Sequence, residues 1–159
     1  MGGGALALAQ MQMPGAPVMV GGLMVELAEG DTSVVVPPAV LNAYLAAVEA
    51  AYSPAAAVSY HNAVHGADAA QTLHSFMRSG LLGAAHMDAI DVFGATLAAL
   101  CHDVGHPGVN AGFLCATGHE LALTYNDVSP LENMHVSTAF KIAKRGEKVD
   151  VFQTLNADQ

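Results

Sequence analysis

Apolar residues recur every three to four positions along most of the chain after residue 36, which is the spacing of helices that bury one face. Residues 39–52 show this pattern clearly, and Pro37-Pro38 suits the first turn of a helix. Five helices are predicted in this way, over residues 39–52, 62–77, 87–103, 120–125 and 130–144. The predicted fold class is therefore all-α, with residues 37–159 forming one helical domain.

Residues 1–36 differ from the rest of the chain. The first thirty residues are rich in Gly, Ala and Met without a sustained period, which predicts a poorly ordered leader. A β-branched run at residues 32–36 could form a short strand. No Lys or Arg precedes Arg78, and Pro and Gly interrupt the apolar residues 5–27. We therefore expect neither a targeting peptide nor a membrane span, and a cytoplasmic location.

Polar residues at the predicted helix ends support these boundaries. Asp88 and Asp91 fall in the opening turns of a helix, where the helix dipole favours negative charge. Ser129 and Glu132 flank Pro130 with the spacing of a capping box. Glu132 therefore has two expected roles, as a cap for its own helix or as part of a functional site, and the two need not exclude each other.

Composition narrows the classes of function. The net charge of −9 disfavours nucleic-acid binding, which needs a basic face, but it allows an anionic nucleotide where divalent cations dominate the local field. With 53% hydrophobic and 12% charged residues, we expect exposed apolar surface and self-association through it. Cys101 and Cys115 lack the spacing of a zinc site, so reduced thiols are predicted, with Cys101 packed as a small apolar residue.

Histidines concentrate in two stretches about forty residues apart. The first holds His61 and His65, which lie one helical turn apart on the same side of a helix. The second holds His102, Asp103 and His106 at the end of a helix that is predicted to be buried. Imidazole and carboxylate are the usual ligands of Zn²⁺ and related hydrolytic metals. Together the stretches predict part of a metal-dependent phosphohydrolase site.

Asp103 gives the strongest reason to expect a cation. Burying an unpaired carboxylate costs on the order of several kcal/mol, and no Lys or Arg lies nearby in the sequence to pair with it. Asp68 comes three residues after His65, close enough to orient its imidazole through a hydrogen bond. The histidines outside these stretches are expected at the surface or at helix ends: His74, His86 and His119.

A third stretch adds another carboxylate and another imidazole, Glu132 and His135. Three phrases then stand in order along the chain: YHNAVHGAD, HDVGHPGVNAGF and YNDVSPLENMH. They resemble the signature blocks of class I cyclic nucleotide phosphodiesterases, and the resemblance covers residues 37–143. Two positions depart from the family pattern, because Gly66 stands where Ala is usual and Met134 replaces the first of two His.

The resemblance implies a role for each matching residue. His65, His102 and Asp103 would bind a zinc ion, and Asp103 would also reach a second ion, Mg²⁺ or Mn²⁺. His61 would donate a proton to the departing 3′-oxygen as general acid. The other matches would hold water molecules around the ions or line the substrate pocket, with His106, Glu132 and His135 in the first role and Tyr60 in the second.

The resemblance further implies the all-α architecture of HD-type metal phosphohydrolases, and hydrolysis of cAMP or cGMP to the 5′-monophosphate. The family's catalytic domain continues with a further metal-binding Asp and with a Gln and a Phe that clamp the purine, so we expect this chain to hold the N-terminal portion of that domain. Two alternatives stay open: an HD-type phosphohydrolase that acts on another nucleotide, and a non-catalytic fragment or pseudoenzyme.

Overall fold

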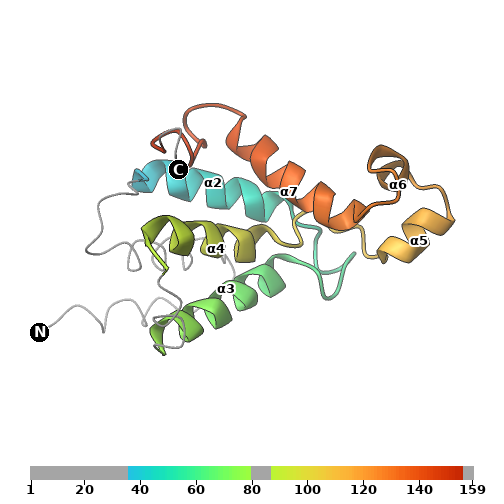
Figure 1. The fold of residues 1–159 in the computed structure, drawn as a ribbon, viewed down its shortest axis with the longest axis horizontal. Helices are drawn as coiled ribbons and strands as arrows, with labels where there is room; N and C mark the ends of the chain where they lie inside the picture. The colour runs from blue at the N-terminus through green and yellow to red at the C-terminus, as the bar shows by residue number, and fades with distance from the viewer. Residues whose placement is uncertain (1–35, 80–86, 156–159) are drawn as a thin grey trace, which may run out of the picture.

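The computed structural model describes residues 36–79 and 87–155 of the chain. Within these ranges it contains helices and no strand (Figure 1). The helices are α2 (Pro38–Ala51), α3 (Ala63–Arg78), α4 (Ala89–Cys101), α5 (Ala111–Ala116), α6 (Glu120–Thr124) and α7 (Pro130–Ala143). The all-α prediction is confirmed, and the five predicted helices occur with their ends within two residues of the predicted ones. The predicted leader and strand lie outside the described residues, except for Val36.

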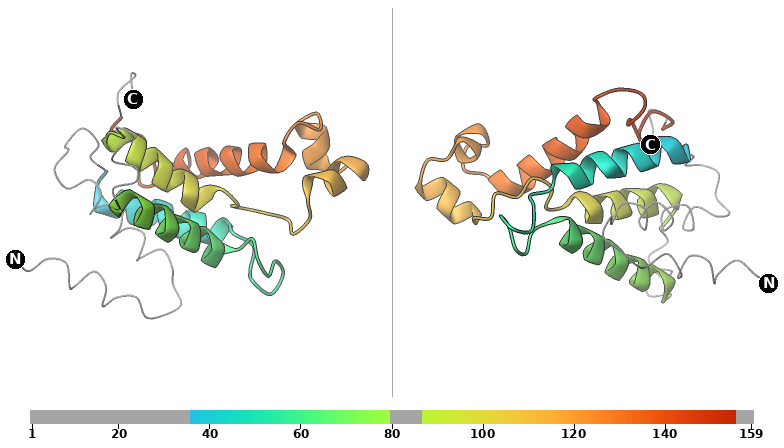
Figure 2. Two further views of the ribbon diagram at one scale, coloured as in Figure 1. Left: turned by 60° about the horizontal axis from the view of Figure 1, so that its bottom comes forward. Right: turned by 180° about the vertical axis from the view of Figure 1, so that it is seen from behind.

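Four of the helices, α2, α3, α4 and α7, lie side by side and form the body of the domain (Figures 1 and 2). The short helices α5 and α6 extend from one end of it. Helix α3 packs on α4, and α7 packs on both α2 and α4. The shared core consists of buried apolar side chains from these helices, among them Leu41, Leu45, Val48, Phe93, Leu97, Leu100 and Ile142. Among the described helices, none combines the length and the apolar character needed to cross a membrane.

Tyr44 lies at the centre of this core and is 1% exposed. Its hydroxyl contacts Sγ of Cys101 at 3.5 Å and donates to the carbonyl of Ala139 at 3.4 Å. Burial raises the pKa of the Cys101 thiol and that of the Tyr44 hydroxyl, so both groups are protonated at neutral pH. Cys101 is therefore the small, buried core residue that the sequence predicted.

Side-chain caps fix the starts of two of the body helices. Asn62 precedes α3, and its side-chain oxygen accepts a hydrogen bond from the N–H of Val64 at 3.0 Å. At the start of α4, the carboxylate of Asp88 accepts from the N–H of Asp91 at 3.0 Å, and the carboxylate of Asp91 accepts from the N–H of Asp88 at 3.2 Å. This reciprocal pair satisfies two of the N–H groups that a helix start leaves without partners.

The capping box predicted at Ser129 and Glu132 is wrong. Ser129 adopts φ 42° and ψ 55°, in the left-handed region, and its side chain makes no cap hydrogen bond. Pro130 then occupies the first helical turn, where it has no N–H to be capped. The side-chain amide of Asn133 closes this turn instead, because it donates to the carbonyls of Val128 at 2.8 Å and Ser129 at 3.1 Å.

Helix α5 is the one described helix that the apolar spacing does not predict. Gly105, Pro107 and Gly108 come just before it and predict a break in helical structure, so no helix was expected there. Asn110 caps it by accepting a hydrogen bond from the N–H of Phe113 at 2.8 Å. Leu114 from α5, Ala122 from α6 and Leu131 from α7 then form a second, smaller apolar cluster. This cluster joins the projecting helices to the body.

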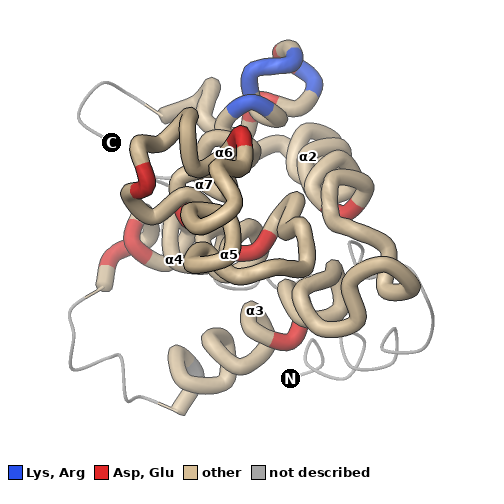
Figure 3. The backbone as a smooth tube through the Cα atoms, turned by 90° about the vertical axis from the view of Figure 1, so that its right-hand side faces the viewer, with Lys and Arg blue, Asp and Glu red and all other residues tan. Residues whose placement is uncertain are grey.

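The basic side chains that the structure describes gather at the end of α7 and in the turn after it (Figure 3). Lys144 pairs there with Asp150 at 2.9 Å. The acidic residues are spread along the whole described chain, and Glu147 and Asp150 lie in this same turn. The basic cluster therefore belongs to the end of a helix, where positive charge is favourable.

Removing the cap of α4 should destabilise the domain. Asp88→Ala removes the acceptor for the N–H of Asp91, and we expect it to lower the free energy of unfolding by about 1 kcal/mol in urea denaturation. Asp88→Asn is the matched control, because Asn caps as well as Asp but lacks the charge. If the free energy of unfolding fell equally in Asp88→Ala and Asp88→Asn, the charge of Asp88, and not its cap hydrogen bond, would stabilise this helix start.

Candidate metal centre

Three separate parts of the chain bring imidazoles to one carboxylate. His65 lies in the first turn of α3, while His102 and Asp103 directly follow the last residue of α4. His135 lies on α7, and its ring faces the same carboxylate. The packing of α3 and α7 against α4 therefore creates a cluster that no single stretch of sequence contains.

His65, His102 and Asp103 form a tight triangle of ligand atoms. Nε2 of His65 lies 3.2 Å from Nε2 of His102 and 3.4 Å from Oδ2 of Asp103. Nε2 of His102 lies 3.1 Å from the same oxygen. Ligands bound about 2.0–2.1 Å from a tetrahedral Zn²⁺ are separated by roughly 3.3 Å, so one face of such a shell has the size of this triangle.

The protonation of His102 shows what this triangle can hold. Its Nδ1 lies 2.9 Å from the carbonyl of Ala99, which can only accept, so Nδ1 carries the proton and Nε2 of the neutral ring presents a lone pair. That lone pair faces the Asp103 carboxylate, which also only accepts. A proton on Nε2 of His65 could form a hydrogen bond with Nε2 of His102 or with Oδ2 of Asp103, but not with both. A cation between the three atoms could be bound by all of them. The donor set therefore fits a zinc-like ion.

No described Lys or Arg pairs with Asp103, whose side chain is 13% exposed and has three imidazoles around it. His65 and His102 approach its Oδ2, and His135 approaches its Oδ1 at 3.7 Å. Nδ1 of His135 donates to the carbonyl of Val104 at 2.8 Å, so its Nε2 also presents a lone pair when the ring is neutral. Both oxygens of Asp103 thus face atoms that can bind or surround a cation.

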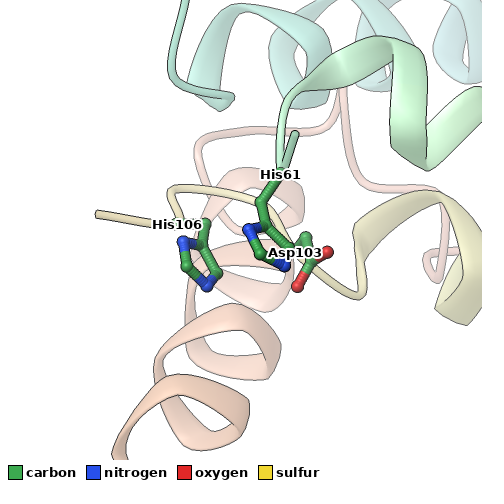
Figure 4. Close-up of side chains that lie close together, drawn as sticks. All are labelled: His61, Asp103 and His106. Carbon is green, nitrogen blue, oxygen red and sulfur yellow. The ribbon is translucent and has the colours of Figure 1, made fainter. Parts of the chain in front are cut away.

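A second set of possible ligand atoms comes from His61, Asp103 and His106, which lie close together (Figure 4). The rings of His61 and His106 are stacked, with centroids 4.0 Å apart. However, the N–H of Gly108 donates to Nδ1 of His106 at 2.9 Å, so the proton of the neutral ring is on Nε2. His106 is therefore a hydrogen-bond donor and not a direct ligand of an ion at Nε2.

Burial and the neighbouring His61 lower the pKa of His106, which is 6% exposed, and this keeps its ring neutral. A neutral Nε2–H suits the predicted role of holding a water molecule beside the ions. Gly105 makes the turn that leads to this residue, with φ +76°, a conformation that favours glycine. Sδ of Met134 lies 3.4 Å from where a Cβ of Gly105 would be, so Met134 closes the outer side of the turn.

Three imidazoles lie nearly parallel at this end of the domain. His106 stacks on His61 with an interplanar angle of 12° and on His135 with an angle of 15°, at centroid distances of 4.0 and 5.7 Å. Tyr60 borders the cluster, with its ring centroid 4.4 Å from that of His65 and 4.9 Å from that of His61. Its side chain is 63% exposed, so it lies where a ligand could reach it.

The structure thus brings together most of the residues that the sequence proposed for the site: Tyr60, His61, His65, His102, Asp103, His106 and His135. It does not bring Asp68 and Glu132 to them. Both side chains are exposed, and neither forms a hydrogen bond or ion pair with the cluster among the described residues. Their predicted roles remain predictions without a contact to support them.

His119 lies outside the cluster and caps α6, with its Nδ1 accepting from the N–H of Leu121 at 3.1 Å. This confirms the prediction of a helix-end role, whereas His86 lies outside the described residues. Sequence reasoning missed the carbonyls of Ala99 and Val104, which set the tautomers of two imidazoles. Backbone carbonyls leave no signal in residue identity, so only the structure could reveal them.

Asp103→Asn should weaken Zn²⁺ binding at least about tenfold, because the charge that balances the cation is lost while the shape is kept. Isothermal titration of the purified chain with Zn²⁺ measures this. Asp127→Asn is the matched control, since it removes the same charge from an exposed turn after α6. Unchanged affinity in Asp103→Asn would mean that the triangle does not hold the ion.

Comparison with known proteins agrees with this geometry. The 3′,5′-cyclic nucleotide phosphodiesterase family matches residues 60–159. A 3′,5′-cyclic-AMP phosphodiesterase 4C from Rattus norvegicus is 42% identical over 124 residues, which are 78% of this chain and 22% of that protein. A 3′,5′-cyclic-nucleotide phosphodiesterase, regA, from Dictyostelium discoideum is 39% identical over 100 residues, which are 63% of this chain and 12% of that protein.

Among solved structures, the phosphodiesterase domain of the RhoPDE fusion protein from Salpingoeca rosetta has the same fold, with a TM-score of 0.77 at 26% identity. The match covers 90% of this chain and 43% of that one. The chain spans about a fifth of the length of the rat relative. The predicted HD-type architecture is thereby confirmed, and the chain belongs to the class I 3′,5′-cyclic nucleotide phosphodiesterase family.

Proposed function

We propose that this chain carries part of a site that hydrolyses a 3′,5′-cyclic nucleotide to the 5′-monophosphate. The observation that carries the proposal is the triangle of His65, His102 and Asp103, with His61 beside it. The family match supports the cyclic nucleotide over another nucleotide as substrate. The rat relative is named for cyclic AMP and the Dictyostelium relative for cyclic nucleotides, so cAMP and cGMP are both substrates to test.

Two divalent cations belong to this proposal. Zn²⁺ suits the two imidazoles and Oδ2 of Asp103. Mg²⁺ or Mn²⁺ suits Oδ1, because a carboxylate oxygen is a harder ligand than an imidazole nitrogen. When bound, such ions activate water and offset the charge of the phosphate. His106 and His135 are placed to orient water around them, because His106 donates through Nε2 and His135 presents a lone pair beside Oδ1.

His61 is the proposed general acid. It lies immediately before Asn62, the N-cap residue of α3, and its ligand atom lies within 4.8 Å of those of Asp103 and His106. The neutral ring of His106 stacks on it at 4.0 Å and holds its plane without competing for a cation ligand. From this position His61 would donate a proton to the departing 3′-oxygen, and Tyr60 would contact the nucleotide.

The described cysteines, Cys101 and Cys115, are both free thiols. Free thiols are typical of a reducing compartment, and we propose the cytoplasm as the location.

We also retain the non-catalytic alternative, because exposed apolar side chains favour an interaction role. The largest of them are Tyr60, Val64, Phe76, Phe113, Leu123, Val128, Val136 and Phe140.

Hydrolysis of cAMP and cGMP by the purified 159-residue chain with Zn²⁺ and Mg²⁺ tests the enzymatic proposal. His61→Ala should lower the turnover number by roughly 10²- to 10⁴-fold, the usual contribution of a general acid. His119→Ala, which removes an imidazole from the cap of α6, should leave turnover unchanged. A folded chain that binds Zn²⁺ but shows no turnover would mean that this part of the site does not hydrolyse the nucleotide by itself, and it would favour the non-catalytic fragment or pseudoenzyme.

Self-association through α7 is a separate proposal. Val136 and Phe140 lie one turn apart on this helix and are 60% and 51% exposed, and the ring of Phe140 stacks on that of Phe152 at 5.1 Å. This exposed apolar stripe is available to a second copy of the chain. Val136→Asp should weaken dimerisation in sedimentation equilibrium, whereas Leu123→Asp on α6 is the control at a different exposed apolar side chain. A purely monomeric wild-type chain would contradict the proposal.

A further inference from the structure

The hydroxyl of Tyr52 satisfies a carbonyl at the end of α4. Tyr52 directly follows α2 and is 7% exposed, and its hydroxyl donates to the carbonyl of Leu100 at 2.8 Å. Leu100 lies in the last turn of α4, where carbonyls lack a partner within the helix. The N–H of Val104, one turn further on, donates to Cys101 instead. Tyr52 is therefore a side-chain cap for the helix end from which His102 and Asp103 emerge.

Gly66 leaves the space that this hydroxyl occupies. A Cβ at Gly66 would lie 2.7 Å from the hydroxyl oxygen of Tyr52 and 3.2 Å from the carbonyl oxygen of Leu100. Real Cβ atoms do not approach an oxygen to 2.7 Å, so any larger residue at position 66 would push α3 away from α4 or displace Tyr52. The glycine is thus required by a close approach of two helices and not by its own backbone angles.

The contact of Tyr52, Gly66 and Leu100 lies directly beside the metal triangle. Gly66 follows His65 in α3, and Leu100 precedes His102 by two residues. One buried hydroxyl therefore touches the helix end that carries two of the triangle's residues and borders the helix start that carries the third.

We propose that Tyr52 is a positioning residue for the metal centre. Its hydrogen bond to Leu100 in the space left by Gly66 sets the separation of α3 and α4 at which His65 and His102 meet Asp103. The 3.2 Å between the two Nε2 atoms depends on this separation, because His65 and His102 lie on different helices or helix ends. This inference rests on the proposed function, in which the triangle holds a divalent cation.

Co²⁺ titration followed by the visible absorption of the bound ion tests this, with thermal denaturation without metal as a second readout. Tyr52→Phe keeps the packed ring and removes only the hydroxyl, and we expect Co²⁺ affinity to fall about tenfold, as when other groups that orient ligands are removed. Thr96→Val is the matched control. It also removes a buried hydroxyl, but one that donates to the carbonyl of Val92 within α4 and not at the end of the helix, so Co²⁺ affinity should not change.

A second pair of variants tests the role of Gly66. Gly66→Ala should weaken Co²⁺ binding more than Tyr52→Phe does, because the new methyl group meets the hydroxyl at 2.7 Å. In the double variant the contact at 2.7 Å is removed, but the methyl group still lies 3.1 Å from Cζ of the ring and 3.2 Å from the carbonyl oxygen of Leu100. Affinity should therefore rise above that of Gly66→Ala and stay below that of Tyr52→Phe. Wild-type affinity in Tyr52→Phe would overturn this inference alone, as would equal losses of Co²⁺ affinity in Tyr52→Phe and Thr96→Val. A wild-type chain that binds no Co²⁺ would overturn the proposed function, and this inference with it.

Discussion

The carboxylate of Asp103 is the constraint on which the site depends. It lies in a largely apolar helical domain, its side chain is 13% exposed, and its neighbours are imidazoles and not Lys or Arg among the described residues. A charge that is largely shielded from water is costly without a counter-charge, and imidazole nitrogens that present lone pairs to it do not offset it. A divalent cation at this place would neutralise the carboxylate of Asp103. It would also accept the lone pairs of His65 and His102.

The scaffold holds this arrangement through contacts that are not themselves ligands. The carbonyls of Ala99 and Val104 fix which nitrogen of His102 and His135 carries the proton, and the N–H of Gly108 does the same for His106 with the opposite result. Two rings therefore present lone pairs and one presents a donor. Chemically identical side chains thus present either a lone pair or an N–H group, according to their backbone partners.

Much of the fold was predictable, because helices that bury one face leave a period in the sequence. Five of the helices were predicted from that period and from the residues at their ends, whereas α5 follows closely on Gly105, Pro107 and Gly108, which predicted a break. The Ser129–Glu132 spacing suggested a capping box, but the left-handed backbone at Ser129 depends on how α6 and α7 meet. Local patterns cannot carry such tertiary information.

The site was predictable to a similar degree. The histidine phrases identified its residue types, yet spacing alone placed Asp68 near His65, and the structure leaves that side chain exposed. Residues three apart share a helix side only approximately, so the direction of the carboxylate depends on the rotation of α3 against α4. Tyr52 gave no signal at all, because its role arises from a contact between segments 48 residues apart.

X-ray absorption of the Zn²⁺-loaded chain tests the central claim most directly. The account predicts a shell with two imidazole nitrogens and carboxylate oxygen at about 2.0–2.1 Å, and the loss of one imidazole from that shell in His65→Ala. A spectrum of fully hydrated Zn²⁺, or one that His65→Ala leaves unchanged, would contradict it.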